Sequence, residues 1–265
     1  ARCIQDYSTT IMLSILKIGG NVLANPAELD KALALFASYE GPAILVHGGG
    51  RKASELLKQM GHTPKMINGP RITDESTLEV VTMVYAGLLN KQLVAQLQAL
   101  NCNAIGLSGA DGNLIRAHKR LVKDIDYGFA GDVDEVNAPG FSALLDAGFK
   151  PVCCAITHDQ KGQLLNTNAD TIAASIATAL ATHYAVDLQY CFEKAGVLLD
   201  AEREDTVIPE INRTYYRELK EQGIVHSGML PKLDNAFDAL AKGVELVQIG
   251  NLASIRAGKA TRLKQ

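Results

Sequence analysis

Short apolar segments recur along the chain, separated by longer segments in which apolar residues follow a helical spacing. The short segments have the length of buried strands, and they predict strands at residues 13–18, 43–47, 104–107, 151–156, 185–192 and 244–249. The longer segments predict helices at residues 26–38, 51–60, 74–100, 139–147, 168–182, 212–222 and 228–242. Alternation of this kind predicts an α/β fold, with a mainly parallel central sheet and helices on both faces, an αβα sandwich.

Two segments interrupt the alternation. Residues 61–73 and 113–136 carry Gly, Pro and β-branched residues in short alternations, which predicts hairpins projecting from the edge of the sheet. No internal repeat or low-complexity linker separates parts of the sequence. We therefore expect residues 1–265 to form a single domain, with an N-terminal lobe to residue 183 and a C-terminal lobe from residue 184.

Composition narrows the classes of function. A chain of 265 residues with 47% apolar content can bury a large core, and a net charge of −3 with 5% aromatic residues argues against broad binding to nucleic acid or anionic membranes. No apolar run reaches the roughly 18 residues of a membrane helix, and the first residues lack the pattern of a secretory signal. We expect a cytoplasmic protein in which Met12 precedes the first strand and residues 1–11 form a short extension. The cysteines, none in a CxxC pair, are expected to be reduced core residues: Cys3, Cys102, Cys153, Cys154 and Cys191.

Glycines follow three of the predicted strands, at residues 19–20, 48–50 and 106–112. A glycine lets backbone N–H groups approach a phosphate closely, although a glycine after a strand often only makes a turn. Three such loops at one edge of a sheet favour an anion site. Neither the P-loop spacing nor GxGxxG is present, so a nucleotide must be held in another way.

Three charged residues are candidates for the chemistry of such a site. Lys17 is at the end of the first strand, Lys232 is one turn into the last predicted helix, and Asp170 begins an apolar helix. Each is also compatible with an ordinary surface role, since Asp is common at helix N-termini.

Six segments in fixed order give these residues a common interpretation. They are GGN at 19–21, HGGG at 47–50, NGPRIT at 68–73, GFAGDVDEVN at 128–137, LLNTNAD at 164–170 and HSGMLPK at 226–232. Together they resemble the amino-acid kinase family over nearly the whole chain, about residues 15–263. Within that family the resemblance is to enzymes of arginine biosynthesis that use ATP to phosphorylate the side-chain carboxylate of N-acetyl-L-glutamate.

The resemblance implies a role for each matched position. Lys17 and Lys232 would be the two lysines that stabilise the transition state, and Asp170 would hold them. Gly49 and Gly50 would present backbone N–H groups to the transferred phosphoryl group and the acyl-amino acid, while Arg71 and Asn166 would bind the α-carboxylate. The nucleotide would be bound by the C-terminal lobe and by Gly19, Gly20, Glu193, Gly196 and Gly228. Mg²⁺ would be carried by the ATP phosphates, with no dedicated metal ligands in the protein.

Elementary chemistry agrees with these roles. A side-chain carboxylate with a pKa of about 4.3 is ionised at neutral pH, so the nucleophile needs no general base. Catalysis must instead overcome repulsion between two anions, through positioning and positive charge.

Departures from the family pattern leave alternatives open. Pro70 stands where a Leu-like residue is expected, Ala110 where a lysine is common, and residues 192–194 replace a TDV-like triplet. An altered acyl pocket would fit N-succinyl-L-glutamate, whose extra carboxylate needs a cation. The segment 61–73 is the expected lid, and its cationic candidates are Lys65, His62 and Arg71. Two further alternatives are another carboxylate or carbamate kinase and a non-catalytic sensor of nucleotides or amino acids.

The family is divided between homodimers and arginine-inhibited hexamers, and the hexamers carry an additional N-terminal helix. Only 12 residues precede Leu13 here, and Asp6, Ser8, Thr9 and Thr10 break any amphipathic pattern. We therefore expect a homodimer without arginine feedback.

Overall fold

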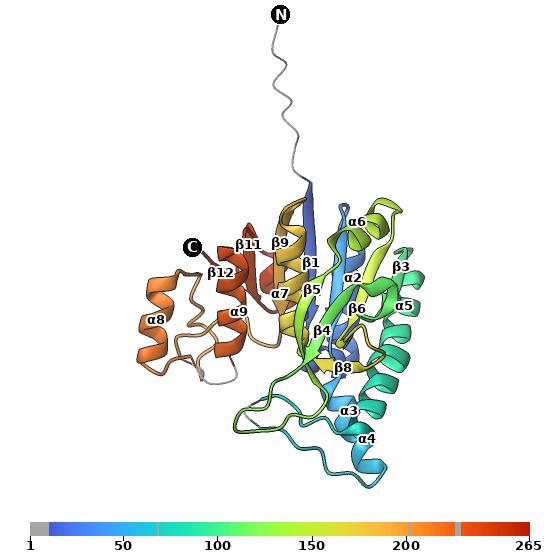
Figure 1. Ribbon diagram of the computed structural model, residues 1–265. Helices are drawn as coiled ribbons and strands as arrows, with labels where there is room; N and C mark the ends of the chain where they lie inside the picture. Colours follow the sequence, from blue (N-terminus) through green and yellow to red (C-terminus); the bar gives the residue numbers. More distant parts are fainter. Residues whose placement is uncertain (1–10, 68, 201, 226–228) are drawn as a thin grey trace, which may run out of the picture.

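A central sheet forms the core of the computed structural model, which describes residues 11–67, 69–200, 202–225 and 229–265. Across these residues eight strands pair in the order β10-β12-β11-β9-β1-β2-β6-β3 (Figure 1). Their bounds are β1 Met12–Ile18, β2 Ala43–His47, β3 Ala104–Leu107, β6 Lys150–Cys154, β9 Ala185–Cys191, β10 Glu210–Ile211, β11 Leu246–Gly250 and β12 Thr261–Leu263. All neighbouring pairs are parallel except β11 and β12, which confirms the predicted α/β fold.

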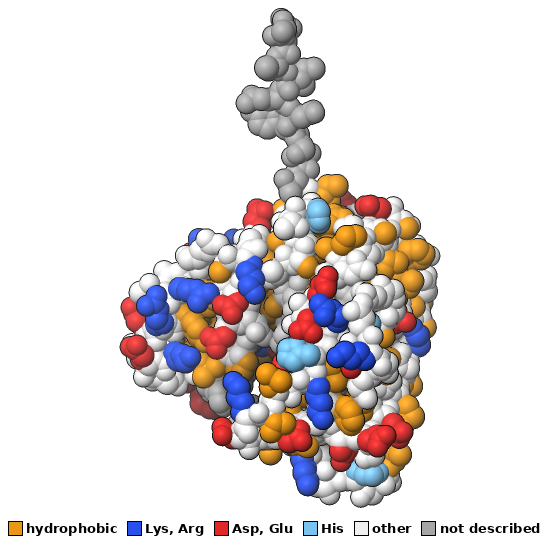
Figure 2. Space-filling view, in the orientation of Figure 1, with side chains coloured by type: hydrophobic (Ala, Val, Ile, Leu, Met, Phe, Trp, Pro, Cys, Tyr) orange, Lys and Arg blue, Asp and Glu red, His pale blue; other side chains and the backbone are white. Residues whose placement is uncertain are grey.

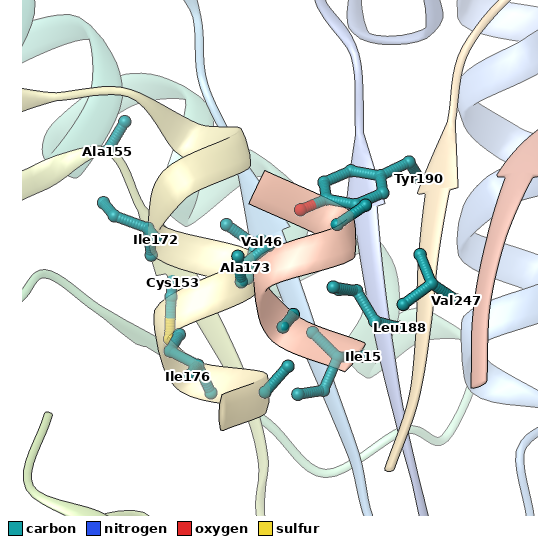
Figure 3. Close-up of a cluster of buried hydrophobic side chains, with 14 of the residues drawn as sticks. Ile15, Val46, Cys153, Ala155, Ile172, Ala173, Ile176, Leu188, Tyr190 and Val247 are labelled. Carbon is teal, nitrogen blue, oxygen red and sulfur yellow. The ribbon is translucent and has the colours of Figure 1, made fainter. Parts of the chain in front are cut away.

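Helices cover both faces of this sheet. Their bounds are α1 Gly20–Ala24, α2 Pro26–Ala37, α3 Gly50–Gln59, α4 Glu75–Thr82, the π-helix η1 Met83–Leu89, α5 Asn90–Ala99, the short 3₁₀ helix η2 Asp111–Asn113, α6 Ala138–Asp146, α7 Ala169–Leu180, α8 Arg213–Glu221, α9 Leu230–Ala241 and α10 Leu252–Arg256. Alternate residues of β1 face opposite layers, as a strand requires. Ile15 packs in the cluster that includes α7 and α9, shown in Figure 3, and Leu16 packs in the cluster that includes α2 and α5.

The chain beyond β3 builds a second, smaller sheet. The strands β4 (Ile115–Lys119), β5 (Ala130–Val136), β8 (Leu164–Thr167) and β7 (Ile156–His158) pair in that order and close on themselves. The antiparallel pair β4 and β5 confirms the hairpin predicted at 113–136. The prediction that this hairpin projects from the edge of the main sheet is wrong, because it forms a separate sheet with β7 and β8.

The other predicted hairpin, at 61–73, has one antiparallel bridge between Met66 and Arg71. Thr73 then pairs with Gly128 at the base of the β4–β5 connection. Gly128 has a φ of +63°, and a Cβ there would lie 2.1 Å from the carbonyl oxygen of Thr73. Glycine is required for this contact, which joins the two loops.

Several predicted boundaries were wrong. The predicted strand 151–156 is divided at Ala155 between β6 and β7, which belong to different sheets. The predicted helix 74–100 is interrupted by the π-helix η1, and the short elements α1, α10, β10 and β12 were not predicted. The lobe boundary predicted at residue 183 stays a prediction. It falls just before β9, which pairs with β1 in the main sheet.

Other expectations concern burial and location. Cys102, Cys153, Cys154 and Cys191 are buried free thiols, as expected, and Cys3 lies outside the described residues. None of the helices in the described ranges is both long and apolar enough to span a membrane. Figure 2 shows basic and acidic side chains interspersed on the face that it draws.

Candidate active site

Three charged side chains from separate elements meet beyond the carboxyl ends of the parallel strands. The Nζ of Lys17, in β1, lies 2.7 Å from Oδ1 of Asp170, at the start of α7. The Nζ of Lys232, in the first turn of α9, lies 3.2 Å from both carboxylate oxygens of Asp170. The structure therefore brings together the three residues that the sequence predicted to act together.

Local structure holds each member in place. The Asn168 side chain caps α7 by accepting hydrogen bonds from the backbone N–H groups of Asp170 and Thr171, at 2.7 and 3.2 Å. A proline in the first turn of α9 favours the start of a helix there, and Lys232 follows it. The Lys232 ammonium group also lies 5.2 Å from the centre of the buried Tyr190 ring.

The charges in this cluster are strongly coupled. Burial alone would raise the pKa of Asp170, but Lys17 and Lys232 outweigh it and lower that pKa to about 2. Burial lowers the pKa of Lys232, and the Lys17 charge acts in the same direction against the opposing effect of Asp170. Asp170 therefore stays ionised between two cations, and the cluster carries a net positive charge.

A cavity of about 470 Å³ opens on one side of this cluster. Its lining includes Lys232 and four of the predicted nucleotide contacts, Gly19, Gly20, Glu193 and Gly196. An apolar wall is formed by Val197, Leu198, Ile224, Val225 and Met229. An apolar wall beside cations suits a nucleotide, whose base is apolar on its faces and whose phosphates are anionic. The fifth predicted contact, Gly228, lies outside the described residues.

The unusual segment 192–194 forms part of this cavity. Phe192, Glu193 and Lys194 all line it, and Lys194 forms a 3.2 Å ion pair with the exposed Glu204. The departure from the family pattern therefore lies at the larger cavity, the one that suits a nucleotide.

A smaller cavity of about 160 Å³ contains the predicted substrate contacts Gly49, Gly50, Arg71 and Asn166. The Arg71 side chain is buried, and its Nη2 donates to the Gly50 carbonyl oxygen at 2.8 Å and to Ser54 Oγ at 2.7 Å. Its Nη1 is buried without a hydrogen-bond partner among the described residues. An unpaired buried donor is costly, so this nitrogen is poised to donate to an anion entering the cavity.

The glycine loop at residues 48–50, which lines the smaller cavity, depends on close packing. An ideal Cβ on Gly49 would lie 2.6 Å from side-chain carbons of both Tyr85 and Leu89, which belong to the π-helix η1. Tyr85 also lines the smaller cavity. Single π turns occur frequently at functional sites, and here the π-helix supplies the surface on which the loop rests.

A buried histidine supports the same loop. The Nδ1 of His47 lies 2.8 Å from the Gly48 carbonyl oxygen, and its Nε2 lies 3.1 Å from Nδ2 of Asn90. Burial lowers the pKa of His47 to about 4, so the ring is neutral at pH 7. The carbonyl oxygen can only accept and the amide nitrogen can only donate, which assigns the proton to Nδ1. His47 therefore orients the glycine loop, and Asn90 holds it.

Two arginines at these cavities were missed by the sequence analysis. Arg120, just after β4, lines the smaller cavity and is paired with Asp132 through Nε at 3.1 Å and Nη2 at 2.6 Å. Arg51, in the first turn of α3, lines the larger one. Arg51 directly follows the HGGG segment, a signal that was available, whereas nothing local to Arg120 predicted its position. The lid candidates Lys65 and His62 are not among the residues that line the smaller cavity.

Comparisons with known proteins agree with this geometry. The profile of the amino acid kinase family matches residues 12–251. A protein named acetylglutamate kinase from Parabacteroides distasonis is 52% identical over 251 residues, covering 95% of this chain and 98% of that protein. One of the same name from Phocaeicola vulgatus is 52% identical over 253 residues, covering 96% and 98%. The crystal structure of smu.665 from Streptococcus mutans UA159 superposes with a TM-score of 0.77 at 26% identity, covering 95% of this chain and 98% of the other. With matches over almost its full length, this chain belongs to the amino acid kinase family.

Proposed function

We propose that this protein transfers the γ-phosphoryl group of ATP to the side-chain carboxylate of N-acetyl-L-glutamate, a step of arginine biosynthesis that yields an acyl phosphate. The observation that carries the proposal is the Lys17–Asp170–Lys232 cluster, together with one cavity suited to a nucleotide and another holding the unpaired Arg71 nitrogen. The relatives named acetylglutamate kinase, at about half identity over almost the whole chain, support the same substrate.

In this proposal the two lysines supply positive charge to the transferring phosphoryl group. Lysine suits this task as a compact point charge, while the planar Arg71 guanidinium suits a carboxylate. Asp170 positions the lysines and is not consumed. Gly49 and Gly50 line the smaller cavity, where their backbone N–H groups would stabilise the acyl-amino acid and the phosphoryl group.

Asn166 completes the proposed substrate contacts. Its Nδ2 donates to Thr73 Oγ1 at 3.0 Å, which fixes the orientation of the amide at the wall of the smaller cavity. Arg71 comes from the lid segment and Asn166 from β8, so the α-carboxylate would be held between that segment and the small sheet.

The nucleotide side of the proposal uses Gly19, Gly20, Glu193 and Gly196. Mg²⁺ would be carried by the nucleotide phosphates, since this ion keeps several of its waters when bound. No base is needed, because the nucleophilic carboxylate is already ionised. The neutral, buried His47 is engaged with the glycine loop on both nitrogens and serves structure instead.

A coupled assay of ADP release tests the proposal. The substrates to compare are N-acetyl-L-glutamate, N-succinyl-L-glutamate, glutamate, aspartate and carbamate. We expect turnover with an N-acylated glutamate and none with aspartate or carbamate. Binding of ATP without turnover on either acylated glutamate would contradict the proposal and indicate a sensor.

N-succinyl-L-glutamate is the second candidate substrate, and the position of Arg120 favours it. Arg71 already offers one cation to the α-carboxylate, and a neutral acetyl group needs no other. Arg120 gives the same cavity a second guanidinium, although Asp132 offsets part of its charge. A kcat/KM for the succinyl substrate more than tenfold above that for the acetyl substrate, lost in Arg120→Gln, would correspond to about 1.4 kcal/mol and establish this alternative.

The homodimer without arginine inhibition and the cytoplasmic location stay predictions. Sedimentation at micromolar concentration is expected to show a dimer, and millimolar arginine is expected to leave turnover unchanged. A hexamer or inhibition by arginine would contradict them.

A further inference from the structure

Arg51 lines the nucleotide cavity together with Lys232 and the paired Lys194, and it takes no part in the cluster around Asp170. Arg51 lines the 470 Å³ cavity from the first turn of α3. It directly follows the glycine loop 48–50 in the sequence. The family resemblance assigned no role to this residue.

One polar contact fixes the Arg51 side chain. Its Nη2 donates to Oδ1 of Asn21 at 2.6 Å. Asn21 lies in α1 directly after Gly19 and Gly20, which line the nucleotide cavity, and Arg51 directly follows the glycine loop 48–50, which lines the smaller cavity, so the contact joins the two glycine segments. The guanidinium is therefore held beside Gly19 and Gly20 at the wall of the nucleotide cavity.

The charge of Arg51 is not balanced within the described residues. Salt bridges in these ranges involve other side chains, and the neighbouring Lys52 illustrates the difference because it pairs with Glu55 at 3.5 Å. Asn21 supplies only a neutral amide oxygen. No acidic residue lies in the first turn of α3, where the helix dipole already disfavours a cation. Arg51 is exposed and solvated by water, and an anion entering the cavity would stabilise its charge further.

We propose that Arg51 binds the terminal phosphates of the nucleotide and that Asn21 positions it. The inference rests on the proposed function, since it takes the larger cavity to hold ATP. A guanidinium can donate two parallel hydrogen bonds to phosphate oxygens, and Nη2 is oriented by Asn21 while the remaining N–H groups are available to the ligand. With Lys17 and Lys232 on the strand and on α9, Arg51 on α3 would add positive charge from a third element.

Binding of nucleotides of different length tests this role. Dissociation constants of ATP, ADP and AMP are measured by isothermal titration calorimetry for the parent, Arg51→Ala and Lys52→Ala. Loss of a charge-assisted hydrogen bond should weaken ATP and ADP binding by about tenfold or more in Arg51→Ala. AMP, which lacks the terminal phosphates, should bind within about twofold of the parent. Lys52→Ala is the matched control, and its three constants should stay within the same twofold range.

Two further variants separate binding from structure. Arg51→Lys should recover part of the lost ATP affinity, because it keeps a charge without the planar fork. Asn21→Ala should raise KM for ATP while leaving KM for the acylated glutamate unchanged.

Two results would overturn the inference. One is ATP affinity in Arg51→Ala equal to that of the parent, and the other is an equal loss for ATP, ADP and AMP. Absence of ATP binding by the parent protein would instead refute the proposed function itself.

Discussion

Replacing Asp170 with Asn removes the one negative charge that separates Lys17 from Lys232. Asn has nearly the same shape, so packing changes little, but a neutral amide oxygen cannot balance two ammonium groups within 2.7 and 3.2 Å. The variant should therefore be less stable than the parent, and both lysine side chains should move from their positions in the cluster.

The size of the effect follows from the pKa of Asp170. The pKa lies at about 2 in the folded protein against 3.8 for an ordinary aspartate, and each unit corresponds to 1.36 kcal/mol. The ionised carboxylate thus contributes about 2 kcal/mol to the free energy of unfolding. The side chain is 20% exposed, so solvent screens this interaction little. Because folding lowers the pKa, the contribution is complete above pH 3.8 and is lost as the pH falls towards 2.

Urea unfolding at pH 7 measures the loss. We expect Asp170→Asn to be less stable by about 2 kcal/mol, and its melting temperature to fall by about 4–8 °C. The difference from the parent should stay constant from pH 8 to pH 5. Asp205→Asn is the control, because its pair with Arg203 is largely exposed and should contribute less than about 1 kcal/mol. Turnover should fall by about 100-fold in Asp170→Asn, since misplacement of a catalytic group by 1 Å has effects of that order.

Two results would refute this reasoning about Asp170. The first is a free energy of unfolding at pH 7 within about 0.5 kcal/mol of the parent, which would show that the three charges are not coupled. The second is a difference that disappears between pH 7 and pH 5, which would assign the effect to another titrating group.

Further predictions concern the remaining site residues. Lys17→Met or Lys232→Met should lower kcat by orders of magnitude, and turnover within about threefold of the parent would remove the assigned role. Arg71→Lys should raise KM for the acylated glutamate by about tenfold with little change in KM for ATP, because charge is kept and the fork is lost; an equal rise in both constants would place Arg71 elsewhere. Gly49→Ala should abolish activity and destabilise the fold by about 1–3 kcal/mol, since its Cβ overlaps side chains of η1; Gly87→Ala, which meets no atom within 4 Å, should not lower the melting temperature and should leave turnover unchanged.

The sequence predicted strands well where glycine ends an apolar run. Predictions at 43–47 and 104–107 match β2 and β3 to the residue, because the apolar pattern stops where the sheet stops. The run 151–156 has no such signal at Ala155, where the chain passes from the main sheet to the small one. Local hydrophobicity records burial but not which sheet a strand joins, so this division was not predictable.

The sequence predicted site residues only where a local motif surrounds them. Lys17, Asp170 and Lys232 were found because ordered motifs surround them, and the two arginines that line the cavities were not. Arg120 approaches the smaller cavity only because β4 and β5 close a sheet with β7 and β8. The π-helix η1 was likewise hidden, since apolar residues continue through 74–100 without a break.

The charge pattern of the site explains why one aspartate is needed among cations. Without nucleotide, two ammonium groups close to each other would repel, and Asp170 offsets that repulsion while leaving the cluster positive. A second carboxylate would balance both lysine charges and weaken the attraction of the cluster for phosphate. With none, burial and the neighbouring Lys17 charge would lower the pKa of Lys232 unopposed and favour its neutral form. One carboxylate between two lysines therefore offsets their repulsion and leaves the cluster positive, which is the condition that the proposed transfer between two anions imposes.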